Sequence, residues 1–196
     1  MNGMNYMRRV SCPAPRHASR GVTLIETLVV MGIVGIFMAI GIPSYKYVTN
    51  ANRISAEING LLGDLQFARS EAIKEGQPVT VCVSSDGASC LGATTTTWRS
   101  GWIVYSDMNG NGAVDAGEVL RAQKTFTGTD TFNANNSIGA ITFNREGFAS
   151  VTNGTLITLH ASPAAQGSTR CLSVTLVGLV TVKKYGDVDA GGNTCQ

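Results

Sequence analysis

The sequence is short of charged residues and lacks the residue patterns that accompany catalysis. Only 14% of its 196 residues are Asp, Glu, Lys or Arg, against roughly 25% in typical soluble domains. The net charge of +2 gives no argument for a nucleic-acid partner. His160 stands alone, without a Gly-x-Ser-x-Gly turn, a phosphate-binding loop or a paired-carboxylate motif anywhere in the chain. We therefore do not expect an enzyme.

Acidic residues are missing from the first 20 positions, which carry four arginines. An uncharged run follows over residues 27–42, and residues 22–25 extend it. Together they are about long enough to cross a bilayer, which takes roughly 20 residues. Because the arginines precede the run, we expect the N-terminus in the cytoplasm and the rest of the chain across the membrane.

One carboxylate, Glu26, interrupts this apolar segment. A charged group inside a membrane is costly and usually has a partner or a function. From the residues alone, Glu26 either marks the edge of the span or has a functional partner. A cleaved secretory signal is a competing interpretation, with its cut near Ala39-Ile40-Gly41. Glu26 and the helical continuation of the segment argue against that interpretation.

The segment of residues 20–26, Arg-Gly-Val-Thr-Leu-Ile-Glu, resembles the prepilin peptidase site of type IV pilins and type II secretion pseudopilins. In that family cleavage follows the glycine, the first mature residue is N-methylated, Glu is the fifth mature residue and Pro the twenty-second. These positions hold Gly21, Val22, Glu26 and Pro43 here, with Val22 where Phe is usual. The resemblance implies removal of a leader of residues 1–21, N-methylation of Val22, and roles in assembly for Glu26 and Pro43.

A second half of the helix is expected after Pro43. Apolar residues recur there at spacings of three and four, at Ile54, Ile58, Leu61, Leu62, Leu65, Ala68, Ala72 and Ile73. Polar residues such as Arg53, Glu57 and Asp64 are expected on the other face. Gly76 and Pro78 end the pattern. We predict one helix over residues 23–75, with a transmembrane half at 22–43 and an amphipathic half at 44–76.

The remaining residues, 77–196, read as a β-rich head. Seven strands separated by turn-rich segments are expected at residues 78–83, 101–106, 118–122, 140–144, 155–159, 170–175 and 178–183. The expected fold class is α+β, of the type IV pilin-like kind. In it, a long N-terminal transmembrane and stalk helix packs on an antiparallel β-sheet head.

The sequence segments at residues 65–72, 98–105 and 143–147 are similar to those of the GspH/FimT family of minor pseudopilins and minor pilins. This resemblance implies a structural subunit that assembles into, primes or caps a type IV pilus or a type II secretion pseudopilus. Its implied partners are other pilins or pseudopilins through the N-terminal helix, prepilin peptidase and the inner-membrane assembly platform. The implied location is the bacterial inner membrane, with a single span and a periplasmic head. The head does not decide between the two systems.

A DNA-binding minor pilin of natural transformation is the alternative function. Some relatives of FimT take up DNA through a C-terminal Gly-Arg-x-Arg loop, but residues 178–181 read Gly-Leu-Val-Thr here. Lys183 and Lys184 remain as candidates for phosphate contacts. Because two lysines on a near-neutral head are usually solvated, nucleic acid is not an expected partner.

The loop of residues 107–118 matches the twelve-residue EF-hand calcium loop, with Gly112 at its sixth position. The candidate ligands are Asp107, Asn109, Asn111, Ala113 (through its carbonyl), Asp115 and Glu118. The flanking segments are expected strands rather than helices, so the competing interpretation is a turn-rich hairpin loop. Calcium is the one possible cofactor.

Five cysteines divide into Cys12 before the apolar run and four after it. Four cysteines in an exported region favour two disulfides, although reduced thiols remain an alternative. Three pairings are possible. The simplest joins Cys82 to Cys90 across a short turn, and Cys171 to Cys195 at the C-terminal tail.

Overall fold

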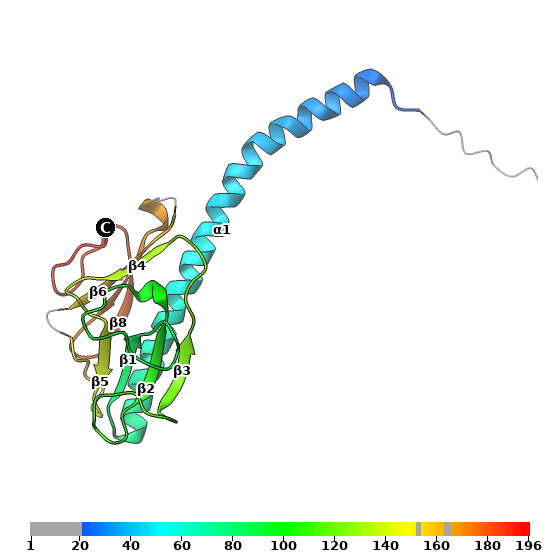
Figure 1. Cartoon of the computed structure of the whole chain (residues 1–196). Coiled ribbons are helices and arrows are strands. Elements are labelled where there is room, and N and C mark those ends of the chain that lie inside the picture. The colour runs from blue at the N-terminus through cyan, green and yellow to red at the C-terminus, as the bar shows by residue number, and fades with distance from the viewer. Residues whose placement is uncertain (1–20, 152–153, 163–165) are drawn as a thin grey trace, which may run out of the picture. The chain divides into compact units, whose positions relative to one another are not determined.

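The structure is a computed structural model, and it describes residues 21–151, 154–162 and 166–196. Helix α1 (Leu24–Glu75) is continuous through residue 43, so the predicted helix is confirmed to within one residue (Figure 1). It ends where Gly76 adopts a φ of 70° and donates its N–H to Ala72 O, a glycine C-cap that other residues adopt only with strain. The chain divides into two compact units between Ser44 and Tyr45.

Among the described residues, the second unit holds eight strands in two antiparallel sheets, so the predicted α+β class with an antiparallel head is confirmed. The first sheet has the order β3-β2-β1-β5 and the second β4-β6-β7-β8. The strands are β1 (Val79–Val83), β2 (Trp102–Ser106), β3 (Val119–Gln123), β4 (Thr131–Ala134), β5 (Ala140–Phe143), β6 (Thr155–His160), β7 (Arg170–Val174) and β8 (Val180–Lys184). Two 3-10 turns, η1 (Trp98–Ser100) and η2 (Gln166–Ser168), lie between them. Seven strands were predicted to within about two residues, and β4 was missed.

Both sheets share one hydrophobic core with the second half of α1. The buried helix positions are Ile54, Ile58, Leu61, Leu65, Ala68 and Ala72, as the three-and-four spacing predicted. Aromatic rings connect the sheets. The ring centres of Trp102 in β2 and Phe132 in β4 lie 6.2 Å apart, and the ring centre of Phe126 lies within 6.3 Å of both. Such ring pairs add about 0.5–1.5 kcal/mol each beyond their buried area.

The outer face of each sheet is covered by a segment that a disulfide holds. Cys82 of β1 is bonded to Cys90, and Cys82, Ile103 and Tyr105 form a small core under that loop. Cys171 of β7 is bonded to Cys195, and both pack with Leu156. The two pairs are those that the spacing favoured. Because both faces are covered, β1 and β2 are buried at every residue and lack the alternation of a half-exposed strand.

Candidate assembly site

The N-terminal end of α1 is formed by a threonine cap. The Thr23 hydroxyl accepts the N–H of Glu26 at 3.3 Å, and the Thr23 carbonyl accepts the N–H and hydroxyl of Thr27. A Thr followed three residues later by Glu is the capping-box pattern, which satisfies backbone donors that the first helical turn leaves free. Glu26 also lies where the helix dipole favours a negative charge. Glu26 therefore has a local role in starting the helix, which the sequence interpretation did not consider.

Gly21 lies just before this cap in open surroundings. A Cβ placed on Gly21 would meet nothing within 4 Å. The fold of this chain therefore does not require glycine at position 21. A requirement for glycine there would come from an enzyme that binds this segment, as the predicted cleavage after Gly21 supposes.

The first half of α1 exposes an apolar surface on all its sides. Large hydrophobic side chains from Val22, which is 71% exposed, to Ile42, which is 56% exposed, lack cover from the described parts of the chain. By length and composition this helix is able to cross a membrane. Core helices of soluble proteins pass the same test, but they are mostly buried, whereas this span is not buried at all. An exposed helix that is apolar all round needs lipid or other helices around it.

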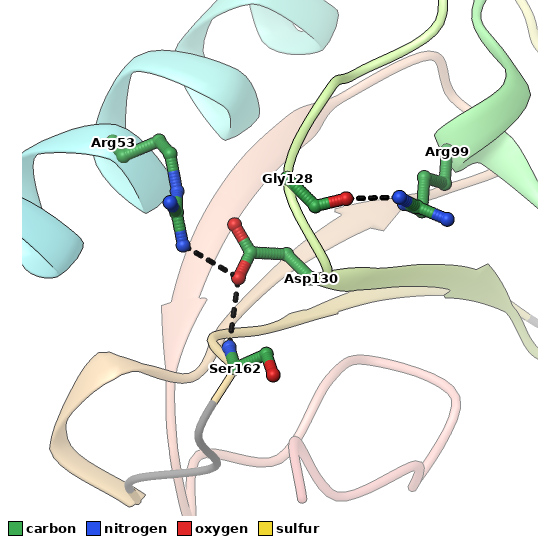
Figure 2. A network of polar contacts seen from close by, with 5 residues as sticks. All are labelled: Arg53, Arg99, Gly128, Asp130 and Ser162. Carbon is green, nitrogen blue, oxygen red and sulfur yellow. Dashed lines mark hydrogen bonds and ion pairs between the residues drawn. The ribbon is translucent and has the colours of Figure 1, made fainter.

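The second half of α1 is tied to the head by an ion pair close to the start of β4. Arg53 Nη2 lies 2.7 Å from Asp130 Oδ1, and the same oxygen accepts the N–H of Ser162 at 2.7 Å. Arg99 of η1 donates to the carbonyl of Gly128, two residues before Asp130. Figure 2 shows these contacts converging on the segment of residues 128–130 from three sides. The ion pair therefore joins α1 to the second sheet.

Asp64 fastens α1 to the first sheet in a similar way. Its carboxylate accepts the indole N–H of Trp102 at 2.8 Å and pairs with Arg121 of β3 at 3.1 Å. The Arg121 guanidinium also lies 3.7 Å from the ring centre of Phe67. The expectation that Arg53, Glu57 and Asp64 occupy a separate polar face was wrong for Glu57, which is only 9% exposed. These polar side chains of α1 belong to the contact between the helix and the sheets.

Arg69 of α1 holds two turns of the head. Its guanidinium donates to the carbonyls of Gly147 and Val177, at 3.1 Å each. Gly178 has a φ of 74°, and a Cβ there would lie 2.0 Å from Gly147 O. The turn at residues 175–178 therefore requires glycine at this position for its conformation and for the close approach of the neighbouring turn.

The loop of residues 107–118 is organised by its own acidic and amide side chains. Asp107 accepts the N–H groups of Asn111 and Gly112, while Glu118, 3% exposed, accepts those of Met108 and Asp115. The amides of Asn109 and Asn111 donate to Asp115. In the described part of the chain, no group of three or more His, Cys, Asp or Glu side chains is placed to hold a metal. Calcium binding by this loop stays a prediction.

Comparison with known families decides the classification. The model of the family described as "Type II transport protein GspH" matches residues 57–178, which is more than half of the chain. The chain belongs to the GspH family. The model of the "Prokaryotic N-terminal methylation motif" matches residues 16–42 of the same chain. This second match covers Gly21, Val22, Glu26 and the exposed apolar helix, so the GspH-family chain is a type IV pilin-like subunit of the minor pilin and pseudopilin kind.

Curated relatives of this GspH-family chain are pilin-like proteins. It is 30% identical to the pilin-like protein PilA1 of Thermus thermophilus over 105 residues. The matched stretch covers 53% of this chain and 58% of PilA1. It is 33% identical over 85 residues to a fimbrial protein of Pseudomonas aeruginosa, over 43% of this chain and 54% of that protein. The chain thus spans just over half the length of these relatives. Among solved structures, the type IV minor pilin FimU of Pseudomonas aeruginosa aligns with a TM-score of 0.47 and 18% identity, over 69% of this chain and 90% of FimU.

The lysines considered for DNA binding lie on β8, the edge strand of the second sheet. Lys183 is half-buried and Lys184 is exposed. In the turn before β8, Leu176, Val177 and Leu179 are all more than half exposed, so the matching loop presents apolar side chains. The comparisons and the described residues give the DNA-binding alternative no support.

Proposed function

We propose that this GspH-family chain is a structural subunit of a type IV pilus or a type II secretion pseudopilus, without catalytic activity. The observation that carries the proposal is the exposed apolar half of α1, which begins directly at the methylation motif. In lipid this surface anchors the chain before assembly. In a filament the same surface packs against the helices of other pilin-like subunits, so one segment serves both states.

Processing prepares the helix for that transfer. Prepilin peptidase cleaves after Gly21, the leader of residues 1–21 stays in the cytoplasm, and the new N-terminus at Val22 is methylated. Glu26 then pairs with the terminal amine of Val22 in a neighbouring subunit. Either charge is costly when it is buried alone, and pairing within the bundle offsets much of that cost. The uncut leader, rich in arginine, would hold the chain in the membrane.

The head faces the periplasm in this proposal. The two disulfides, which hold the segments over the outer faces of the sheets, suit an oxidising compartment, where such bonds form and persist. The inner-membrane assembly platform receives the anchored subunit, and Pro43 eases bending between the apolar and amphipathic halves of α1 during assembly.

The GspH description favours a secretion pseudopilus, while the names of the curated relatives favour a pilus. A deletion strain separates the two, since loss of secreted proteins indicates a pseudopilus and loss of surface pili indicates a pilus.

The Glu26→Val variant tests the assembly mechanism. We expect it to be cleaved, to remain in the membrane fraction, and to be missing from filaments sheared off the cell. Leu28→Val is the matched control, because it changes a nearby exposed residue of the same helix without removing a charge or a side-chain contact of the cap, and it should enter filaments. Incorporation of Glu26→Val at the level of the control would contradict the proposed role of the carboxylate.

A further inference from the structure

A cluster of four charged side chains lies where α1 meets the second sheet. Arg53 and Glu57 stand one turn apart on α1, Arg99 belongs to η1, and Asp130 directly precedes β4. Glu57 interacts electrostatically with the other three. We call these four residues the α1 charge cluster. Glu57 and Asp130 are both almost fully buried, at 9% and 3% exposed.

The bonds within the α1 charge cluster are unevenly shared. Both bonds to Asp130 reach the same oxygen, Oδ1, from Arg53 and from the N–H of Ser162. The second oxygen, Oδ2, is buried, as is Oε2 of Glu57, and neither has a hydrogen-bond partner among the described residues. The Nε groups of Arg53 and Arg99 are buried in the same way and bond to neither oxygen. A buried carboxylate oxygen without a donor is costly, so two such oxygens in one cluster need an explanation.

We propose that Glu57 is a proton-binding site of the head, which holds Glu57 as a neutral acid that donates its O–H to the carboxylate of Asp130. One proton then satisfies both oxygens, because a protonated carboxyl group donates and an ionised one accepts. Asp130 keeps the negative charge that its bond to Arg53 requires. The site fastens α1 to the segment before β4 most tightly when the proton is bound.

The surroundings of Glu57 agree with this assignment. Burial of the side chain and, next, the neighbouring negative charge of Asp130 raise the pKa of Glu57 above its usual range. Arg53 and Arg99 lower the pKa by smaller amounts. The side chain of Arg53 is 39% exposed, so water screens part of its charge.

The proton site predicts an unusual dependence of stability on pH. A carboxyl group whose pKa is raised by folding binds its proton more tightly in the folded state than in the unfolded state. Its contribution to stability is therefore lost as the pH rises from the ordinary Glu value, roughly 4.3, through the folded pKa of Glu57. Asp86 acts in the opposite direction: hydrogen bonds from Ser89, Ala88 and Ser84 hold its pKa far below the usual range, so its contribution is lost only in stronger acid.

The experiment uses the full chain in detergent micelles, with unfolding by urea followed through the fluorescence of the two buried tryptophans. Measurements at about pH 5 and about pH 8 lie on the two sides of a raised glutamate pKa. We expect the urea midpoint of the wild type to be higher at the lower pH. Glu57→Gln, whose amide also donates to Asp130, should show a smaller difference between the two pH values than the wild type does, and should match or exceed the wild type at the higher one. Glu146→Gln, which changes an exposed glutamate, should keep the wild-type dependence.

Infrared spectroscopy of the folded chain provides a second readout that does not depend on a variant's stability. At the lower pH, the carbonyl band of protonated carboxylic acid should be stronger in the wild type than in Glu57→Gln, because exposed carboxyl groups contribute equally to both. If Glu57→Gln does not fold, the excess of this band in the folded wild type over the urea-unfolded wild type at the same pH carries the test. A wild type without this excess, a midpoint that is flat or falls on acidification, or a Glu57→Gln variant less stable than the wild type at the higher pH would each overturn the proposal. The last result would indicate an ionised Glu57 that pairs with Arg99.

Discussion

Replacing Arg53 by Met tests how strongly α1 is fastened to the second sheet. Methionine keeps the apolar stem of the side chain and removes the guanidinium, so the change isolates the ion pair from packing. Asp130 then loses the donor to Oδ1 that comes from α1, while the N–H of Ser162 remains. The Asp130 side chain is only 3% exposed in the wild type, so its carboxylate stays buried in the variant.

The expected magnitude lies between two limits. Breaking a fully buried ion pair costs about 3–5 kcal/mol, whereas a fully exposed pair contributes about 0–1 kcal/mol. Asp130 is 3% exposed and Arg53 39% exposed, so we expect a loss of about 2 kcal/mol in the free energy of unfolding. For a domain of this size, that corresponds to a fall in Tm of about 4–8 °C.

The assay is thermal unfolding of the full chain in detergent at neutral pH, followed by tryptophan fluorescence. Trp98 and Trp102 are both fully buried in the shared core, so their emission reports loss of the packed head. Arg145→Met is the control, because the Arg145–Glu146 pair is 73% and 54% exposed and its loss should hardly change Tm. Equal Tm values for Arg53→Met and Arg145→Met would refute the anchoring role of the Arg53–Asp130 pair.

The two disulfides and the acidic loop give the remaining predictions. Removing the Cys171–Cys195 bond, which spans 24 residues, should cost about 3.5 kcal/mol, and removing Cys82–Cys90, which spans 8, about 2.5 kcal/mol. Urea midpoints of the two Cys→Ser pairs check this order, and a reversed order would contradict the loop-length argument. Calcium titration by calorimetry should show binding that Glu118→Gln abolishes, and absence of binding in the wild type would exclude a calcium site in residues 107–118.

Local sequence patterns predicted the helix and most strands of this fold better than they predicted which strands pair with one another. The helix could be predicted because each half has a clear pattern. The first half is apolar throughout, and in the second half apolar residues recur every three or four positions. Both disulfides follow from short separations in the chain. Strand β4 was missed because Thr131–Ala134 holds one large apolar residue and an Asn, and its extended form depends on pairing with β6. The division into two sheets depends on such long-range pairing, which no local pattern encodes.

The polar contacts of α1 were predicted less well for a related reason. A helical pattern assigns Glu57 to the polar face, but the second sheet covers that face near Asp130 and buries the carboxylate. Arg99 and Asp130 are distant in the sequence from Arg53 and from each other, so no spacing indicates that they meet. In contrast, the assembly motif is a single continuous segment. The positions of Gly21, Val22 and Glu26 could therefore be matched to the family's motif within one short stretch of sequence, and the methylation-motif model covers the same stretch.

The central claim is that the apolar half of α1 becomes the N-terminus of a mature filament subunit. Intact-mass measurement and N-terminal sequencing of the chain purified from its own cells test this claim most directly. We expect a chain that begins at N-methylated Val22, and a Gly21→Leu variant that keeps its leader. A mature chain that begins at Ile42, after Ala39-Ile40-Gly41, would show a cleaved secretory signal and would contradict the assembly mechanism.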